Sequence, residues 1–238
     1  MQDNYVGDIG DYGKYGLLRT VCSEGGCLAV NWYKVEPKKV SKQDDGKYTN
    51  YLKNPEKYRK YDPALFDSLY KILFVDGDRS IQRIEKEQLF FAKCFSDEVT
   101  GDRLSWHKKA LQKTSGAEIV FLDPDNGLET FNMFCKDKAT EKHVKWLELK
   151  DYYQRGQNVI LYQHRPQMIK KEMCVESVLR FQCEYLKADG VMLLEFPKYT
   201  NRFYFFFLHN EYREKFNKVC DLMIQNWGKE NFCRKIDV

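Results

Sequence analysis

Residues 117–129 read AEIVFLDPDNGLE, an apolar run that ends abruptly in a polar turn. A short apolar run bounded by turn residues is typical of a central strand covered on both faces of a sheet. Ligands of open α/β sheets bind just beyond the carboxyl ends of such strands, so Asp123, Asp125 and Asn126 are candidate catalytic residues. The alternative is a plain polar turn, which favours the same residue types for backbone reasons. Two carboxylates this close repel each other unless something offsets their charge, and this favours the functional interpretation.

The composition indicates a single α/β domain over residues 1–238. Hydrophobic residues make up 43% of the chain, and the formal net charge of +4 permits nucleic acid as a partner without requiring it. The 8 cysteines form no CxxC pair, which disfavours a structural zinc site. The sequence shows no signal peptide and no apolar run of about 18 residues. We therefore expect a cytoplasmic protein with free thiols and no membrane association.

The N-terminal stretch at residues 5–19 reads YVGDIGDYGKYGLLR and predicts a loop that runs into a helix from about Asp11. A spacing of three places Asp11 and Lys14 on one helical face, and Asp8 precedes them at the same spacing. These residues are candidates for shaping a pocket. An N-cap aspartate with a surface ion pair is an equally good interpretation.

The rest of the chain alternates predicted strands and helices. Residues 28–33 and 158–162 have the pattern of buried strands, and residues 191–196 and 202–208 that of an antiparallel hairpin. Helices are predicted at residues 147–155, 167–186 and 211–227. Residues 34–113 form a loop and helical insert, with interleaved Lys and Tyr up to residue 61 and a helical pattern from residue 63 to 113. This order predicts a mostly parallel sheet with a C-terminal antiparallel hairpin.

Polar residues also follow the strand at 158–162, which ends in Tyr162. Gln163 and His164 come next, and His164 is a candidate acid–base residue, although a satisfied structural histidine is the more common case. Trp32, near the end of the first strand, and Tyr162 are candidate stacking surfaces for a base.

Three separated stretches resemble the bacterial rRNA adenine-N6 methyltransferases. GDIGDYGK at residues 7–14 is similar to that family's GNxxDxxK segment, DPDN at residues 123–126 stands where the family has its catalytic DPPY, and YQHRP at residues 162–166 follows the next strand. The chain is also similar to uncharacterised bacterial proteins that share the stretches GDIGDYGKYG and FLDPDNGLE. The resemblance implies a Rossmann-like methyltransferase-type three-layer sandwich. It also implies S-adenosylmethionine as cofactor, with Asp8, Asp11, Trp32 and Tyr162 near it.

Two departures from the family pattern bear on that function. The family needs a Gly-rich turn after its first strand for the methyl donor, and here residues 31–34 read NWYK with no glycine until Gly46. DPPY also supplies an aromatic ring that stacks on a flipped base, and Asp125 and Asn126 supply none. The fold and the activity therefore have to be argued apart.

Three functions remain open at this stage. The first is an enzyme that modifies nucleic acid or nucleotides, by methyl transfer at a degenerate donor site, in which Asp123 binds the target amino group and Lys14 and Asp11 shape the pocket. The second is a Mg²⁺-dependent phosphodiesterase or nuclease, in which Asp123, Asp125 and Glu129 bind the metal through oxygen ligands. The third is a non-catalytic binding protein on the same scaffold. Under either enzyme hypothesis, Asp123→Asn is expected to abolish activity and to leave the melting temperature nearly unchanged.

Overall fold

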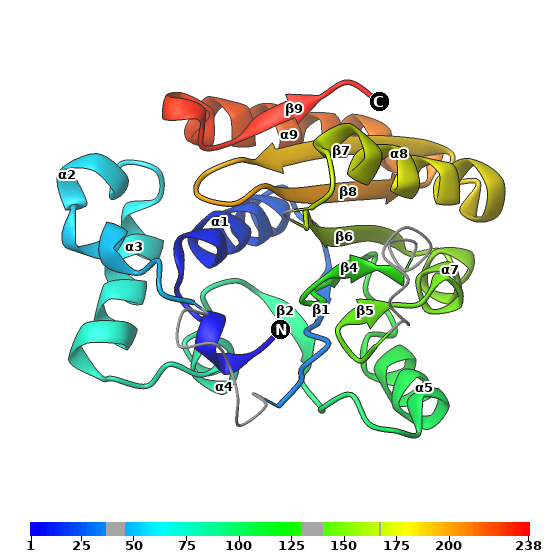
Figure 1. The fold of residues 1–238 in the computed structure, drawn as a ribbon, viewed down its shortest axis with the longest axis horizontal. Helices are drawn as coiled ribbons and strands as arrows, with labels where there is room; N and C mark the ends of the chain where they lie inside the picture. Colours follow the sequence, from blue (N-terminus) through cyan, green and yellow to red (C-terminus); the bar gives the residue numbers. More distant parts are fainter. Residues whose placement is uncertain (37–45, 130–139, 167) are drawn as a thin grey trace.

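The computed structural model describes residues 1–36, 46–129, 140–166 and 168–238 (Figure 1). Its main sheet has seven strands in the order β2-β1-β3-β6-β8-β7-β9. Neighbours among β2, β1, β3 and β6 are parallel, whereas β8 is antiparallel to both β6 and β7, and β9 is antiparallel to β7. The strands span Leu28–Asn31 (β1), Ala92–Phe95 (β2), Ile119–Leu122 (β3), Asn158–His164 (β6), Gly190–Phe196 (β7), Arg202–Leu208 (β8) and Arg234–Ile236 (β9).

Helices cover both faces of this sheet. Alternate residues along each strand point to opposite faces, so the buried side chains divide into two cores. One core contains residues of α1 (Ile9–Ser23), α3 (Pro63–Tyr70), α4 (Ile81–Lys86) and α9 (Arg213–Trp227). The other contains residues of α5 (Arg103–Lys113), α7 (Trp146–Gln154) and α8 (Lys171–Phe181). A short helix, α2 (Pro55–Tyr58), and a two-stranded sheet of β4 (Gly127–Leu128) and β5 (His143–Val144) complete the α-helices and strands of the described residues, and short 3-10 and π-helical turns lie between them.

The predicted α/β class, the parallel core and the antiparallel C-terminal hairpin are confirmed. The predicted helices at residues 147–155 and 211–227 correspond to α7 and α9. The helix predicted at residues 167–186 begins four residues later, at Lys171, and residue 167 itself lies outside the described residues. None of the helices in the described parts of the chain is long and apolar enough to span a lipid bilayer.

The helical pattern predicted within residues 63–113 is confirmed by α3, α4 and α5, but the prediction missed β2, which lies between α4 and α5 and pairs with β1 at the edge of the sheet. An edge strand is buried on one side at most, and only Phe95 of β2 is fully buried, so its sequence carries neither a continuous apolar run nor a clean alternation. The same reason explains why β9, the opposite edge, was not predicted.

The N-terminal stretch is helical two residues earlier than predicted, and α1 contains three of its glycines. These glycines repeat every three residues and so share one helical face. A methyl group at any of them would collide with a side chain packed against that face: Gly10 with Arg202, Gly13 with Phe196 and Gly16 with Trp227. Glycine is present here for close packing of α1 against β7, β8 and α9. The predicted helix is confirmed, and only its start differs, at Ile9 instead of about Asp11.

Candidate functional site

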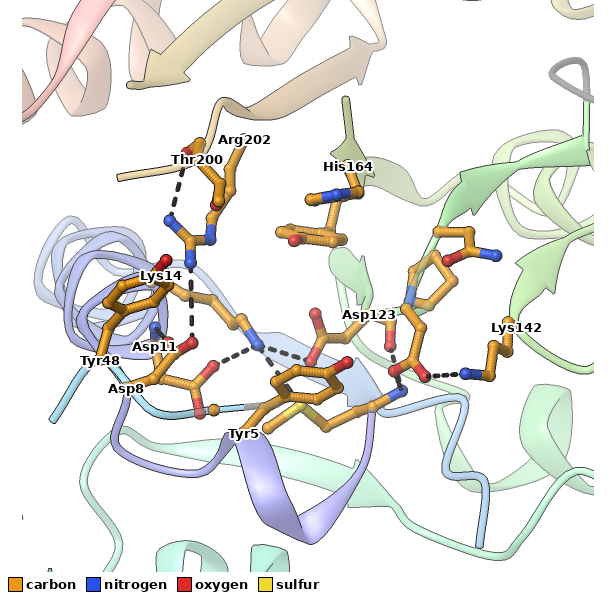
Figure 2. Close-up of a pocket in the computed structure, with 17 residues that line it drawn as sticks. Tyr5, Asp8, Asp11, Lys14, Tyr48, Asp123, Lys142, His164, Thr200 and Arg202 are labelled. Atoms are coloured by element: carbon orange, nitrogen blue, oxygen red, sulfur yellow. Dashed lines mark hydrogen bonds and ion pairs between the residues drawn. The ribbon is translucent and has the colours of Figure 1, made fainter. Parts of the chain in front are cut away.

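A cavity of about 240 Å³ lies at the edge of the sheet where β3 and β6 end and β8 begins (Figure 2). The N-terminal end of α1 forms its opposite wall. All the predicted site residues except Trp32 and Glu129 line it: Asp8, Asp11, Lys14, Asp123, Asp125, Asn126, Tyr162 and His164. Residues from three distant stretches of the sequence therefore meet at one opening.

The start of α1 positions the first two acids. Asp8 is the N-cap, and its carboxylate accepts a hydrogen bond of 2.9 Å from the Asp11 backbone N–H. The Asp11 carboxylate accepts hydrogen bonds from the Gly7 backbone N–H at 3.2 Å and from the Tyr15 hydroxyl at 2.8 Å. Asp8 and Asp11 are thus held at the helix terminus, where its dipole favours negative charge.

Lys14 links α1 to the end of β3. Its Nζ lies 2.7 Å from Asp11 Oδ1 and 2.8 Å from Asp123 Oδ2, and its side chain is buried. Burial alone lowers the pKa of Lys14, but the carboxylates of Asp11 and Asp123 hold this pKa well above its ordinary value. Lys14 is therefore a permanent positive charge, further surrounded by the rings of Tyr15, Trp32 and Tyr162.

Asp123 and Asp125 differ in protonation behaviour. Burial raises the pKa of Asp123, and Lys14 and the Met1 ammonium only partly offset this. Burial also raises the pKa of Asp125, but the Met1 ammonium at 2.9 Å, the Gln2 amide and Lys142 together bring it below its ordinary value. Two carboxyl groups whose pKa values are pushed apart suit different roles in proton transfer.

One oxygen of Asp123 remains available to a ligand. Lys14 engages Oδ2, and no hydrogen bond or ion pair from the described residues engages Oδ1. Figure 2 shows the two oxygens of this carboxylate pointing in different directions, one of them toward Lys14. The carboxylate can therefore accept a further hydrogen bond without losing its ion pair.

The turn after Asp123 is fixed by Gln163. The Gln163 amide donates to the Asn126 carbonyl at 3.1 Å and accepts from the Leu128 N–H at 2.8 Å. Gly127 has a φ of +107° and lies directly against this amide, so both its backbone conformation and the lack of space require glycine. Asn126 is therefore presented to the cavity by a rigid turn.

His164 and Arg202 face each other across the register of β6 and β8. Burial and the charges of Arg202 and Arg165 lower the pKa of His164 to about 4, so its imidazole is neutral at pH 7. Arg202 Nη2 lies 3.6 Å from Asp8 Oδ2, and its guanidinium lies in front of the α1 terminus (Figure 2). The sequence-based prediction missed Arg202, although an arginine at the start of the apolar run RFYFFFL is an informative signal.

Other residues of the cavity wall were missed as well. They are Met1, Tyr5, Tyr48, Lys142 and Thr200, together with Gly10, Gly46 and Pro124. Tyr48 belongs to the Lys- and Tyr-rich stretch that was predicted as a solvated loop, and nothing in the sequence places it beside α1.

Trp32, predicted as a stacking or cofactor-binding residue, does not line the cavity, so the structure does not bring it together with the other candidate residues. It is fully buried, its Nε1 donates a hydrogen bond of 2.8 Å to Glu85, and its ring packs between Tyr15 and Phe90. The next residue, Tyr33, is fully buried in the opposite core. Both residues follow β1 directly, where the methyltransferase resemblance implies a Gly-rich turn for S-adenosylmethionine, and two buried aromatic residues do not fit such a turn.

Glu129, predicted as a metal ligand under the nuclease hypothesis, does not line the cavity either. Its Oε1 accepts a hydrogen bond of 2.7 Å from the Trp146 backbone N–H at the start of α7. Within the described ranges, no group of three or more His, Cys, Asp and Glu side chains is arranged to hold a metal ion. Asp123 and Asp125 are instead paired with ammonium groups, as expected for structural or acid–base roles.

Comparisons with known proteins add no family to this description. No protein-family model matches the chain, and no curated protein sequence matches it significantly, so its function has to be argued from the cavity itself.

Proposed function

We propose that this protein is an enzyme that modifies nucleic acid or nucleotides, with the base to be modified bound in the cavity. The observation that carries the proposal is Asp123, a buried carboxyl group of raised pKa whose Oδ1 is not engaged by the described residues. Such a group can accept a hydrogen bond from an exocyclic amino group and take up its proton during reaction. Raised pKa values of this kind are concentrated at functional sites.

The other cavity residues suit the parts of a nucleotide. Lys14 and Asp11 hold Asp123 in position, and Tyr48 and Tyr162 offer ring faces to a base. Arg202 and Lys142 supply positive charge to a phosphate. A neutral His164 can accept or donate a hydrogen bond without adding charge.

The sheet favours a methyltransferase-like scaffold within this proposal. Its antiparallel strand β8 lies between β6 and β7, an arrangement that the Rossmann-like methyltransferase fold also has. The proposed reaction includes no step through S-adenosylmethionine, because Trp32 and Tyr33 are both buried after β1 and leave no glycine turn there. Within this proposal, Asp123 holds the exocyclic amino group by a hydrogen bond and takes up the proton that its nitrogen loses during modification.

Calorimetric titration tests the proposal. Each nucleoside monophosphate, S-adenosylhomocysteine and Mg²⁺ is titrated separately. Mixed oligonucleotides are also incubated with the protein, in the presence and in the absence of S-adenosylmethionine, and are analysed for changes in nucleoside mass. Saturable binding of a nucleotide together with a mass change supports the proposal, and binding of S-adenosylhomocysteine would assign methyl transfer. Binding of Mg²⁺ with strand cleavage supports the nuclease instead, and nucleotide binding without any reaction supports a non-catalytic protein.

The variant Asp123→Asn tests the role of Asp123 as the group that takes up the proton. We expect it to lower the rate by about 10²- to 10⁴-fold, because the amide cannot take up a proton. Since Asp123 also neutralises the buried Lys14, the variant is expected to lose stability as well, which revises the expectation from sequence alone. Activity is therefore measured per folded molecule, with Asp67→Asn on the exposed face of α3 as the matched control. An unchanged rate per folded Asp123→Asn molecule would contradict the assignment.

A further inference from the structure

Two exposed tyrosines form a stacked pair beside the cavity. The rings of Tyr48 and Tyr199 lie 5.0 Å apart at an angle of 24°, and these residues are 36% and 56% exposed. Tyr48 lines the cavity, and Tyr199 directly precedes Thr200, which also lines it. The pair therefore continues the cavity wall outward over the protein surface (Figure 2 shows Tyr48 and Thr200).

Tyr199 has an unfavourable backbone conformation, and hydrogen bonds hold both tyrosines in place. Tyr199 has a φ of +64°, in the left-handed region that bulky residues rarely adopt. The Tyr48 carbonyl accepts a hydrogen bond of 3.0 Å from the Ile9 N–H at the start of α1, and the Tyr58 hydroxyl lies 3.4 Å from that of Tyr199. Tyr199 lies in the turn between β7 and β8, and its ring stays more than half exposed although it stacks on Tyr48. A bulky residue held in this conformation with an exposed ring suggests a function for that ring.

A basic cluster lies at the outer end of the pair. Lys60 Nζ forms an ion pair with the Glu230 carboxylate, and Lys198 Nζ donates a hydrogen bond of 3.4 Å to the Glu230 carbonyl. The hydrogen bond from Lys60, together with the charges of Lys60, Lys57 and Lys198, lowers the pKa of Glu230. Lys57 Nζ also lies 5.4 Å from the ring centre of Tyr58. A continuous series of contacts therefore leads from the cavity through Tyr48, Tyr199 and Tyr58 to the cluster of Lys57, Lys60 and Lys198.

We propose that the Tyr48–Tyr199 pair and the lysines at positions 57, 60 and 198 bind the nucleotides next to the one in the cavity, so that the substrate is a single-stranded nucleic acid. This inference rests on the proposed function, because it names the substrate class of the same site. Exposed aromatic rings beside a positively charged track are how proteins bind single strands without strict sequence preference. A free mononucleotide would leave both features unused, and a duplex would not expose base faces to the rings.

The test compares ligands and variants by fluorescence anisotropy and calorimetry. A labelled single-stranded oligonucleotide of about ten nucleotides, as DNA and as RNA, is compared with the corresponding duplex and with the mononucleotide. Tyr199→Ala removes the stacking face, and Tyr199→Phe keeps the ring and removes only the hydroxyl contact. Tyr185→Ala is the matched control and removes an exposed tyrosine in the helical turn Gln182–Leu186 that follows α8.

We expect Tyr199→Ala to weaken binding of the single strand by about 5- to 150-fold. Tyr199→Phe and Tyr185→Ala should leave it unchanged, and mononucleotide binding should be the same in all variants. Replacing Lys57 and Lys198 by Gln should reduce the slope of log affinity against log salt by about 0.7 for each phosphate that the variant no longer neutralises.

Two outcomes would overturn the inference in different ways. If the mononucleotide binds but the single strand binds no tighter, or if Tyr199→Ala leaves the affinity for the single strand unchanged, the Tyr48–Tyr199 pair does not bind neighbouring nucleotides. The proposed function then still stands. If neither ligand binds, the proposed function fails and the inference fails with it.

Discussion

Lys14 is the residue on which the electrostatics of the site depend. It is the buried cation between Asp11 and Asp123, and both carboxylates lie within 2.8 Å of it. Removing one partner of a buried ion pair leaves an uncompensated buried charge, which costs about 3–5 kcal/mol. Lys14→Met should therefore lower the free energy of unfolding by about that amount, measured by urea denaturation.

A matched control comes from Arg59, which pairs with Asp67 on the surface at 2.7 Å. Exposed ion pairs contribute little to stability because water screens them. Arg59→Met should leave the free energy of unfolding unchanged. If Lys14→Met changed the free energy of unfolding equally little, the ion pairs of Lys14 with Asp11 and Asp123 would not be buried.

His164 makes the protein sensitive to acid. Its pKa is about 4 in the folded protein against an ordinary value of 6.5, so the unfolded chain binds the proton more tightly. Stability is fully present above pH 6.5 and is lost as the pH falls toward 4, by about 3 kcal/mol for this group. His164→Gln removes this contribution, so the stability of the variant should fall less than that of the native protein between these pH values. Parallel stability curves would contradict the assignment.

Among the elements, the packing of α1 depends on the helical face formed by Gly10, Gly13 and Gly16. In an ordinary helix, Gly→Ala stabilises by about 1 kcal/mol, because alanine has the better helix propensity. At Gly16 the added methyl would overlap the buried Trp227 ring, so Gly16→Ala should instead destabilise by about 1–3 kcal/mol. Gly101→Ala, where nothing lies within 4 Å, is the control and should change stability by less than about 0.5 kcal/mol. The free energies of unfolding of the two variants are measured by urea denaturation. A stabilising Gly16→Ala would show that α1 does not pack directly against the Trp227 ring.

The elements that sequence predicted correctly are those whose burial leaves a clear pattern. The runs IVFL of β3 and RFYFFFL of β8 are buried along their whole length, and such runs follow directly from the need to remove apolar surface from water. Strands β2 and β9 lie at the two edges, where half of each strand faces solvent and the pattern fades. The start of α1 was misjudged because glycine signals a loop locally, and only packing against β7, β8 and α9 explains it.

At the scale of the whole molecule, topology explains which site residues could be predicted. Strands β3 and β6 are parallel, so Asp123 and His164 had to reach the same edge of the sheet. Strand β8 runs the opposite way, so its first residue, Arg202, also lies at that edge, but this follows only once β8 is known to pair with β6. Tyr48 reaches the cavity through contacts that no sequence pattern records.

The proposed function requires that a base occupies this cavity with its amino group at Asp123. The decisive experiment is a crystal structure of the protein with a saturating nucleoside monophosphate. We expect the base to lie between α1 and the turn at residues 123–126, with an exocyclic nitrogen within hydrogen-bond distance of Asp123 Oδ1 and the Lys14–Asp123 ion pair intact. A nucleotide bound elsewhere, with this cavity empty, would contradict it.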